Sequence, residues 1–230
     1  MKNLLLAALV FLLLSATAGQ TLSEPKAPTP SPALSPDDGK VTDNLYENNY
    51  FRFVIRFPIG WYVHGQETNK RVMELGRSSL KDKGVVSNAT MDVAEKHTFI
   101  LLNVLEKPLG TPGLKANRAL IAIAEDVSFA PGIRTGEDYL LNLEPTLEKV
   151  GWTKVALEHT QIGGIEFGRL IMKTPSNSFE SFTSTIRQGY ALGFIALADS
   201  QDRLADANAA MATCKFEATS VKPSTSGATK

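Results

Sequence analysis

Eight residues in the first third of the chain read Tyr50-Phe51-Arg52-Phe53-Val54-Ile55-Arg56-Phe57. Their apolar side, which comprises Phe51, Phe53, Ile55 and Phe57, alternates with a side that carries both arginines. Because successive side chains of a strand point to opposite faces, this period of two predicts a strand with one buried face. The following Pro58-Ile59-Gly60-Trp61 predicts the turn that ends the strand.

Two further stretches, residues 98–105 and 118–124, are almost continuously apolar. Such runs are typical of strands that are covered on both faces. The second run is rich in alanine, so a short buried helix is the alternative. Residues 152–157 are also expected to form a strand.

Gly163-Gly164 predicts a tight turn into the next strand, residues 165–173. Ile165, Phe167 and Ile171 share its apolar face, although Arg169 falls on the same face. Residues 179–186 and 190–198 flank Arg187-Gln188-Gly189 and are expected to form a hairpin.

Three helices are predicted beside these strands, and the first covers residues 68–80, where apolar residues lie near helical spacing and no proline occurs. Residues 136–150 have apolar residues at helical spacing, but Pro145 removes an amide donor, so we expect this helix to kink or restart there. A third helix should run to about Thr213, capped by Asp199 or Ser200.

The chain begins with features of an export signal. Lys2 precedes an apolar run from Leu4 to Leu14, which is too short to span a bilayer, and Ala16, Ala18 and Gly19 fit a signal-peptidase site. We therefore expect cleavage after Ala18, with an uncleaved anchor as the alternative. The mature chain is expected to have no integral membrane span and to be periplasmic or extracellular.

Composition divides the rest of the chain. The domains expected are a signal peptide (1–18), a Pro-rich disordered linker (19–43), a globular domain (44–218) and a disordered tail (219–230). Proline and small polar residues dominate the linker, which has too little apolar surface to fold.

Charge and cysteine content narrow the possible partners. The chain carries 24 basic and 24 acidic residues and no net charge, so no general field attracts nucleic acid. We expect the partner to be another protein or an envelope component.

The single cysteine, Cys214, cannot form an intramolecular disulfide, and its apolar surroundings predict a buried, inert thiol.

No catalytic, cofactor or metal residue is assigned from motifs. His64, His97 and His159 lie far apart in the sequence, outside any metal-ligand spacing. The alternative is an enzyme or metal site assembled in space from these histidines with Glu125 and Asp126. Such a site requires at least two of the five residues to lie within ligand distance.

Exposed aromatic residues indicate protein-binding surfaces. Trp61, Tyr62 and Trp152 are the candidates, with burial in the core as the alternative.

Three stretches together resemble the PsbP-like family, which shares its fold with the Ran-binding Mog-type proteins. They are residues 50–61, Gly163-Gly164-Ile165-Glu166-Phe167, and Arg187-Gln188-Gly189-Tyr190-Ala191-Leu192 followed by a helix and Lys215-Phe216. The resemblance implies an α+β fold: an α/β/α sandwich with a central, mostly antiparallel sheet of about seven strands and helices on both faces. It also implies binding or assembly roles rather than catalysis, although a fold alone does not define a function.

Overall fold

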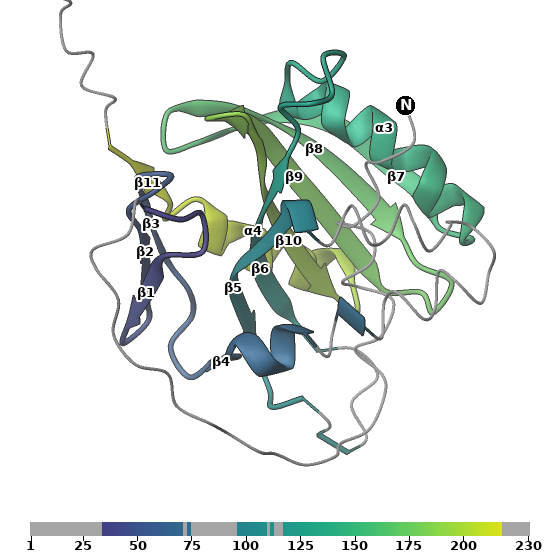
Figure 1. Ribbon diagram of the computed structural model, residues 1–230. Coiled ribbons are helices and arrows are strands. Elements are labelled where there is room, and N and C mark those ends of the chain that lie inside the picture. The colour runs from purple at the N-terminus through teal and green to yellow at the C-terminus, as the bar shows by residue number, and fades with distance from the viewer. Residues whose placement is uncertain (1–33, 71–72, 75–95, 110, 113–116, 218–230) are drawn as a thin grey trace, which may run out of the picture.

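The computed structural model describes residues 34–70, 73–74, 96–109, 111–112 and 117–217 (Figure 1). The predicted cleavage residues Ala16, Ala18 and Gly19 lie outside these ranges, and the helix predicted over residues 68–80 lies only partly within them. In sheet order, the small sheet contains β1 (Gly39–Thr42), β2 (Leu45–Asn48), β3 (Phe53–Arg56) and β11 (Lys215–Phe216). The large sheet contains β4 (Tyr62–Val63), β5 (Thr98–Leu105), β6 (Ala119–Asp126), β10 (Tyr190–Ala198), β9 (Phe179–Arg187), β8 (Ile165–Lys173) and β7 (Thr153–Ile162). Two helices, α3 (Gly136–Lys149) and α4 (Gln201–Met211), pack on the large sheet.

The fold class predicted from the sequence is wrong. The protein is mostly β, with two antiparallel sheets of four and seven strands, rather than a single sheet covered by helices on both faces. The layer opposite α3 is formed by the small sheet together with the short helix α4 (Figure 1). β1 begins at Gly39, inside the range expected to be a linker, and all four of its side chains are exposed. An exposed strand lacks the apolar signal on which the prediction relied.

The large sheet has a separate hydrophobic core on each face. On one face, α3 packs on β7, β8 and β9 around Ile121, Leu140, Leu147, Leu170 and Phe182. On the other face, the small sheet and α4 enclose a larger cluster that includes Phe51, Phe53, Phe167, Phe194, Leu204 and Met211. Because β6 and β10 are covered from both sides, nearly every residue in them is buried. The alternative of a helix at 118–124 is therefore excluded.

Residues of the three family-like stretches meet where the two sheets join. Phe53 of β3 lies 5.6 Å, between ring centroids, from Phe194 of β10 and 5.7 Å from Phe216 of β11. Phe167 of β8 lies 5.9 Å from Phe194 and 6.1 Å from Phe216. We call these four residues the aromatic junction. Such ring pairs stabilise by roughly 0.5–1.5 kcal/mol each beyond their burial, so the junction holds the small sheet on the large one.

Helix α3 is continuous through Pro145, so it does not restart there, which was one of the two predicted outcomes. The carbonyl that Pro145 leaves without its helical donor belongs to Leu141, an exposed residue, and water can satisfy an exposed carbonyl. Thr135 caps the helix: its hydroxyl accepts from the amide of Asp138, whose carboxylate accepts from the amide of Thr135. Ser200 caps α4 in a similar way, as predicted.

Candidate binding groove

The structure separates the three aromatic residues that the sequence offered as a binding surface. Trp152 is only 4 % exposed and packs 6.0 Å from Phe182 in the core beneath α3, so it does not contribute to a surface. Trp61 is half-buried, with the guanidinium of Arg118 5.7 Å above its ring. Tyr62 is 49 % exposed and remains a surface candidate beside the exposed Val63.

Only one pair forms among the five dispersed residues considered for an enzyme or metal site. His97 Nδ1 lies 3.5 Å from Asp126 Oδ2. Glu125 points to the opposite face, where the Tyr139 hydroxyl donates to its carboxylate at 2.7 Å. Among the residues that the structure describes, no group of three His, Cys, Asp or Glu side chains could hold a metal ion.

The other two histidines lie elsewhere. His64, near β4, is half-buried, and burial lowers its pKa. His159 in β7 stands between two carboxylates, with Nε2 3.3 Å from Glu137 and Nδ1 3.1 Å from Glu166. Cys214 is buried, as predicted, and burial raises the pKa of its thiol to about 12.

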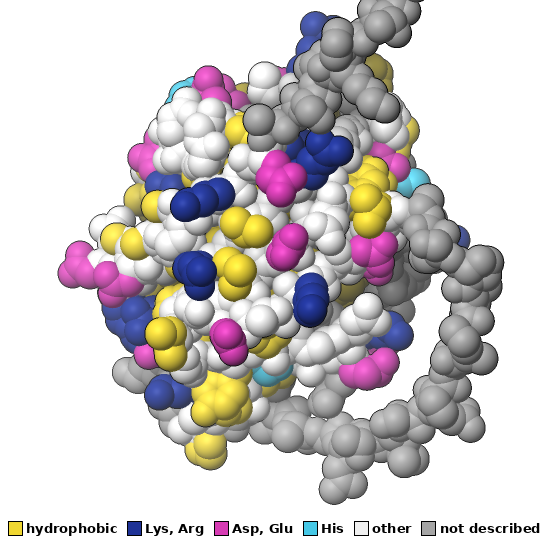
Figure 2. Space-filling model, turned by 90° about the vertical axis from the view of Figure 1, so that its left-hand side faces the viewer, with side chains coloured by type: hydrophobic (Ala, Val, Ile, Leu, Met, Phe, Trp, Pro, Cys, Tyr) yellow, Lys and Arg dark blue, Asp and Glu magenta, His cyan; other side chains and the backbone are white. Residues whose placement is uncertain are grey.

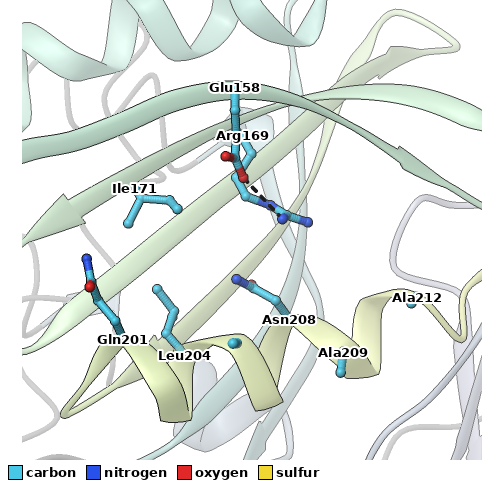
Figure 3. Close-up of a pocket in the computed structure, with 9 residues that line it drawn as sticks. Glu158, Arg169, Ile171, Gln201, Leu204, Asn208, Ala209 and Ala212 are labelled. Atoms are coloured by element: carbon cyan, nitrogen blue, oxygen red, sulfur yellow. Dashed lines mark hydrogen bonds and ion pairs between the residues drawn. The ribbon is translucent and has the colours of Figure 1, made fainter.

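A groove of about 460 Å³ lies between α4 and the face of β7 and β8 (Figure 3). Its sheet wall presents Glu158, Arg169 and Ile171. Its helix wall presents Gln201, Leu204, Ala205, Asn208, Ala209 and Ala212. Figure 3 shows Arg169 and Glu158 facing α4 across this opening, which we call the α4 groove.

The groove follows from the way α4 crosses the sheet. The helix rests mainly on β10 and β9, so the neighbouring strands β8 and β7 extend beyond its cover. Residues 205, 209 and 212 on the helix wall are exposed alanines, and their short side chains leave space between α4 and the sheet. Three residues anchor the N-terminal half of α4: the Arg203 guanidinium contacts Glu106 at 2.6 Å, and Arg118 contacts the same carboxylate at 3.0 Å. The walls are therefore held by packed elements.

Arg169 is the main charged group in the groove. Its Nε donates to the Thr183 hydroxyl at 3.2 Å, and its Nη1 lies 3.4 Å from Glu158 Oε1. The Arg169 side chain is 16 % exposed and that of Glu158 47 % exposed. A guanidinium has five N–H donors, so these two contacts leave capacity for a ligand. Nearby, the Ser181 hydroxyl donates to the side-chain oxygen of Asn208 at 2.6 Å, which orients that amide.

The sequence contained one signal for this site. Arg169 interrupts an otherwise apolar strand face, and a charge in such a position needs a partner or an opening to solvent. It has both here. Nothing in the sequence pointed to Glu158, Gln201 or Asn208, because their proximity depends on the crossing of α4 over the sheet.

The two ends of the described domain lie together, away from β7. Leu34 and Glu217 line one pocket of about 440 Å³ beside β3 and β11. Arg187 strengthens this corner by donating to the Phe51 carbonyl at 2.8 Å and lying 5.0 Å over the Phe216 ring. In Figure 1, β7 is on the opposite side of the molecule from β1 and β11.

The surface of the small sheet carries charges of both signs. Figure 2 shows basic and acidic side chains interspersed with apolar ones on this side of the molecule.

The described residues also contain no helix long and apolar enough to cross a membrane. No protein-family model matches the chain, and no curated protein matches it.

Proposed function

We propose that the protein is a non-catalytic binding or assembly module that works outside the cytoplasm and holds a partner protein in the α4 groove. The observation that carries this proposal is the groove itself, an open cleft with fixed walls and a partly satisfied arginine. Binding sites on helices and strands position their polar groups better than sites on loops do. The two ends of the described domain lie beside β3 and β11, on the opposite side of the molecule from β7.

The chemistry of the groove favours binding over catalysis. Arg169 and Glu158 pair with each other, so neither stands alone as an acid or base. Cys214, the single thiol, is buried, and its raised pKa keeps it protonated and weakly nucleophilic at neutral pH. The resemblance to the PsbP-like family, with its binding and assembly roles, belongs to the same proposal. Its support is that the three stretches pack together at the aromatic junction.

Filling the groove tests the proposal. Ala209 is exposed on the helix wall, so Ala209→Trp should obstruct the cleft and leave the core intact. Twelve-residue peptides selected from a random display library on the purified domain should lose affinity at least about tenfold on this variant, a loss of about 1.4 kcal/mol. Fluorescence anisotropy measures the affinity, and a thermal melt checks that the variant folds.

Lys40→Trp is the matched control, because it places the same ring on the exposed strand β1. The selected peptides should bind this variant with the same affinity as they bind the unaltered protein. Peptides that bind Ala209→Trp undiminished, or a library that yields no ligand at all, would contradict a binding role for the groove.

Export has a test of its own. The secreted chain should begin at Gly19, and mass spectrometry of the intact protein should show the loss of residues 1–18. Ala18→Arg should prevent the cut, because signal peptidase requires a small residue there, whereas Thr17→Arg should not. A chain that retains Met1 to Ala18 in the envelope fraction would indicate an anchor instead.

A further inference from the structure

Strand β7 is an open edge of the large sheet. It is ten residues long and, among the described strands, pairs on one side only, with β8, whereas the other edge strand, β4, has two residues. Natural sheets usually protect their edges with short strands, prolines, bulges or inward charges. β7 has one bulge near its start, between Lys154 and Ala156. From Ala156 to Ile162, β7 pairs with β8 in an unbroken register, and this segment contains no proline.

This regular part of β7 can accept another strand. In an antiparallel pair, alternate residues direct their N–H and C=O groups toward the neighbouring strand, and the others direct them away. Within the described part of the chain, no strand pairs with β7 on its outer side, so there its outward groups have no partner in the sheet. Most of its side chains are exposed as well. Among the described elements, β7 packs on β8 and α3, and neither covers that outer side.

Carboxylates border this edge on both faces of the sheet. Glu158 points to the α4 face at the rim of the groove, where its partner Arg169 is the more buried of the two. The next residue, His159, points to the α3 face, between Glu137 and Glu166. The basic residue closest along the strand, Lys154, is already paired with Glu144 of α3 at 2.6 Å. The open edge therefore presents three carboxylates, of which Glu158 is paired with Arg169 and the other two lie beside His159.

We propose that β7 takes up an extended segment of the partner protein as an eighth strand of the large sheet, and that this segment carries basic side chains at two successive positions. Directly opposite residues of paired strands have Cβ atoms roughly 4.5–5.5 Å apart. A basic residue opposite Glu158 would extend the row Arg169–Glu158 with alternating charge. The next basic residue, opposite His159, would face Glu137 and Glu166 on the other side. The inference rests on the proposed function, because Glu158 forms the rim of the α4 groove.

Synthetic peptides test this directly. The probe is a capped ten-residue peptide of alternating valine and threonine with two central arginines, labelled for fluorescence anisotropy. It should bind the purified domain, and a peptide with two central glutamates should bind at least tenfold more weakly. The variant Glu158→Gln combined with Glu166→Gln should weaken the arginine peptide about tenfold, whereas Glu47→Gln on the exposed face of β2 should not.

Backbone modification separates strand pairing from simple charge attraction. Two versions of the arginine peptide carry N-methyl groups on alternate residues, odd in one and even in the other, and so block opposite edges of the peptide strand. Strand addition requires that one version loses binding and the other retains it. Amide hydrogen exchange of the domain should show protection at alternate residues between Ala156 and Ile162 when the peptide is bound.

The outcomes distinguish this inference from the proposed function. If both methylated peptides bind equally, or if the protected amides lie outside β7, strand addition is overturned. If the arginine peptide does not bind while library peptides still respond to Ala209→Trp, the groove binds a partner in another way and only this inference fails. If the library peptides also bind Ala209→Trp as tightly as the unaltered protein, the proposed function fails together with this inference.

Discussion

Gly136→Ala is expected to lower the free energy of unfolding by about 3 kcal/mol, because a methyl group at this position has no space. Gly136 is the first residue of α3, and a Cβ there would overlap the backbone carbonyl of Ser184 in β9. Gly168 of β8 meets the same helix end, where a Cβ would lie 2.9 Å from the Glu137 amide nitrogen. The two glycines let the start of α3 contact the backbone of the sheet. Urea unfolding followed by circular dichroism measures the loss.

Gly132→Ala is the control for this change. Gly132 is exposed, and a Cβ there would meet nothing within 4 Å. Alanine restricts the unfolded chain at such a site, so this variant should be unchanged or slightly more stable, by up to roughly 1 kcal/mol. Equal stability of the two variants would show that α3 can move away from β9 at little cost.

The secondary structure was largely readable because strands of eight to ten residues carry enough side chains to display a pattern. β5, β6, β9 and β10 lie where the apolar runs predicted them. Gly163 and Gly164 adopt positive φ in the turn between β7 and β8. Gly189 does the same between β9 and β10. Local residue chemistry was therefore sufficient for these elements.

The arrangement of layers was not readable, because β1 and β2 of the small sheet have little apolar signal. β2 is held partly by buried polar groups: the Asn48 side chain donates to the Pro36 carbonyl at 2.8 Å and accepts from the Phe51 amide at 2.8 Å. A periodicity of apolar residues cannot reveal an asparagine whose partners are backbone groups. For Trp152 the sequence left a surface and the core both open, since its burial depends on α3 covering the start of β7.

A second large effect is expected from pH, because Glu125 is 1 % exposed inside the sheet. Burial raises its pKa from the usual 4.5 to about 7, although the hydrogen bond from Tyr139 opposes this change. The folded protein thus holds the proton more tightly than the unfolded chain. Raising the pH from 4.5 to 7 lowers the free energy of unfolding by about 1.4 kcal/mol per pH unit, or about 3 kcal/mol altogether. Above pH 7 Glu125 adds little further change.

Glu125→Gln should remove this dependence, because the amide is neutral at every pH and its oxygen can still accept from Tyr139. Relative to the unaltered protein, the variant should gain about 3 kcal/mol of stability between pH 4.5 and pH 8. The difference between the two urea midpoints at each pH isolates Glu125 from other titrating groups. For Glu47→Gln, on an exposed part of β2, the difference in urea midpoint from the unaltered protein should be the same at every pH. A constant difference for Glu125→Gln would mean that the buried carboxyl does not titrate in this range.

Glu180 in β9 is a second buried carboxyl of the same kind. It is 1 % exposed, and its Oε2 has no hydrogen-bond partner among the described residues. Burial raises its pKa well above the usual value, without the opposing hydrogen bond that Glu125 has. The loss of stability from Glu180 should therefore also begin as the pH rises above the usual carboxyl value of 4.5. Glu180→Gln should make the stability profile flatter than that of the unaltered protein, and the double variant with Glu125→Gln should be flatter than either single variant.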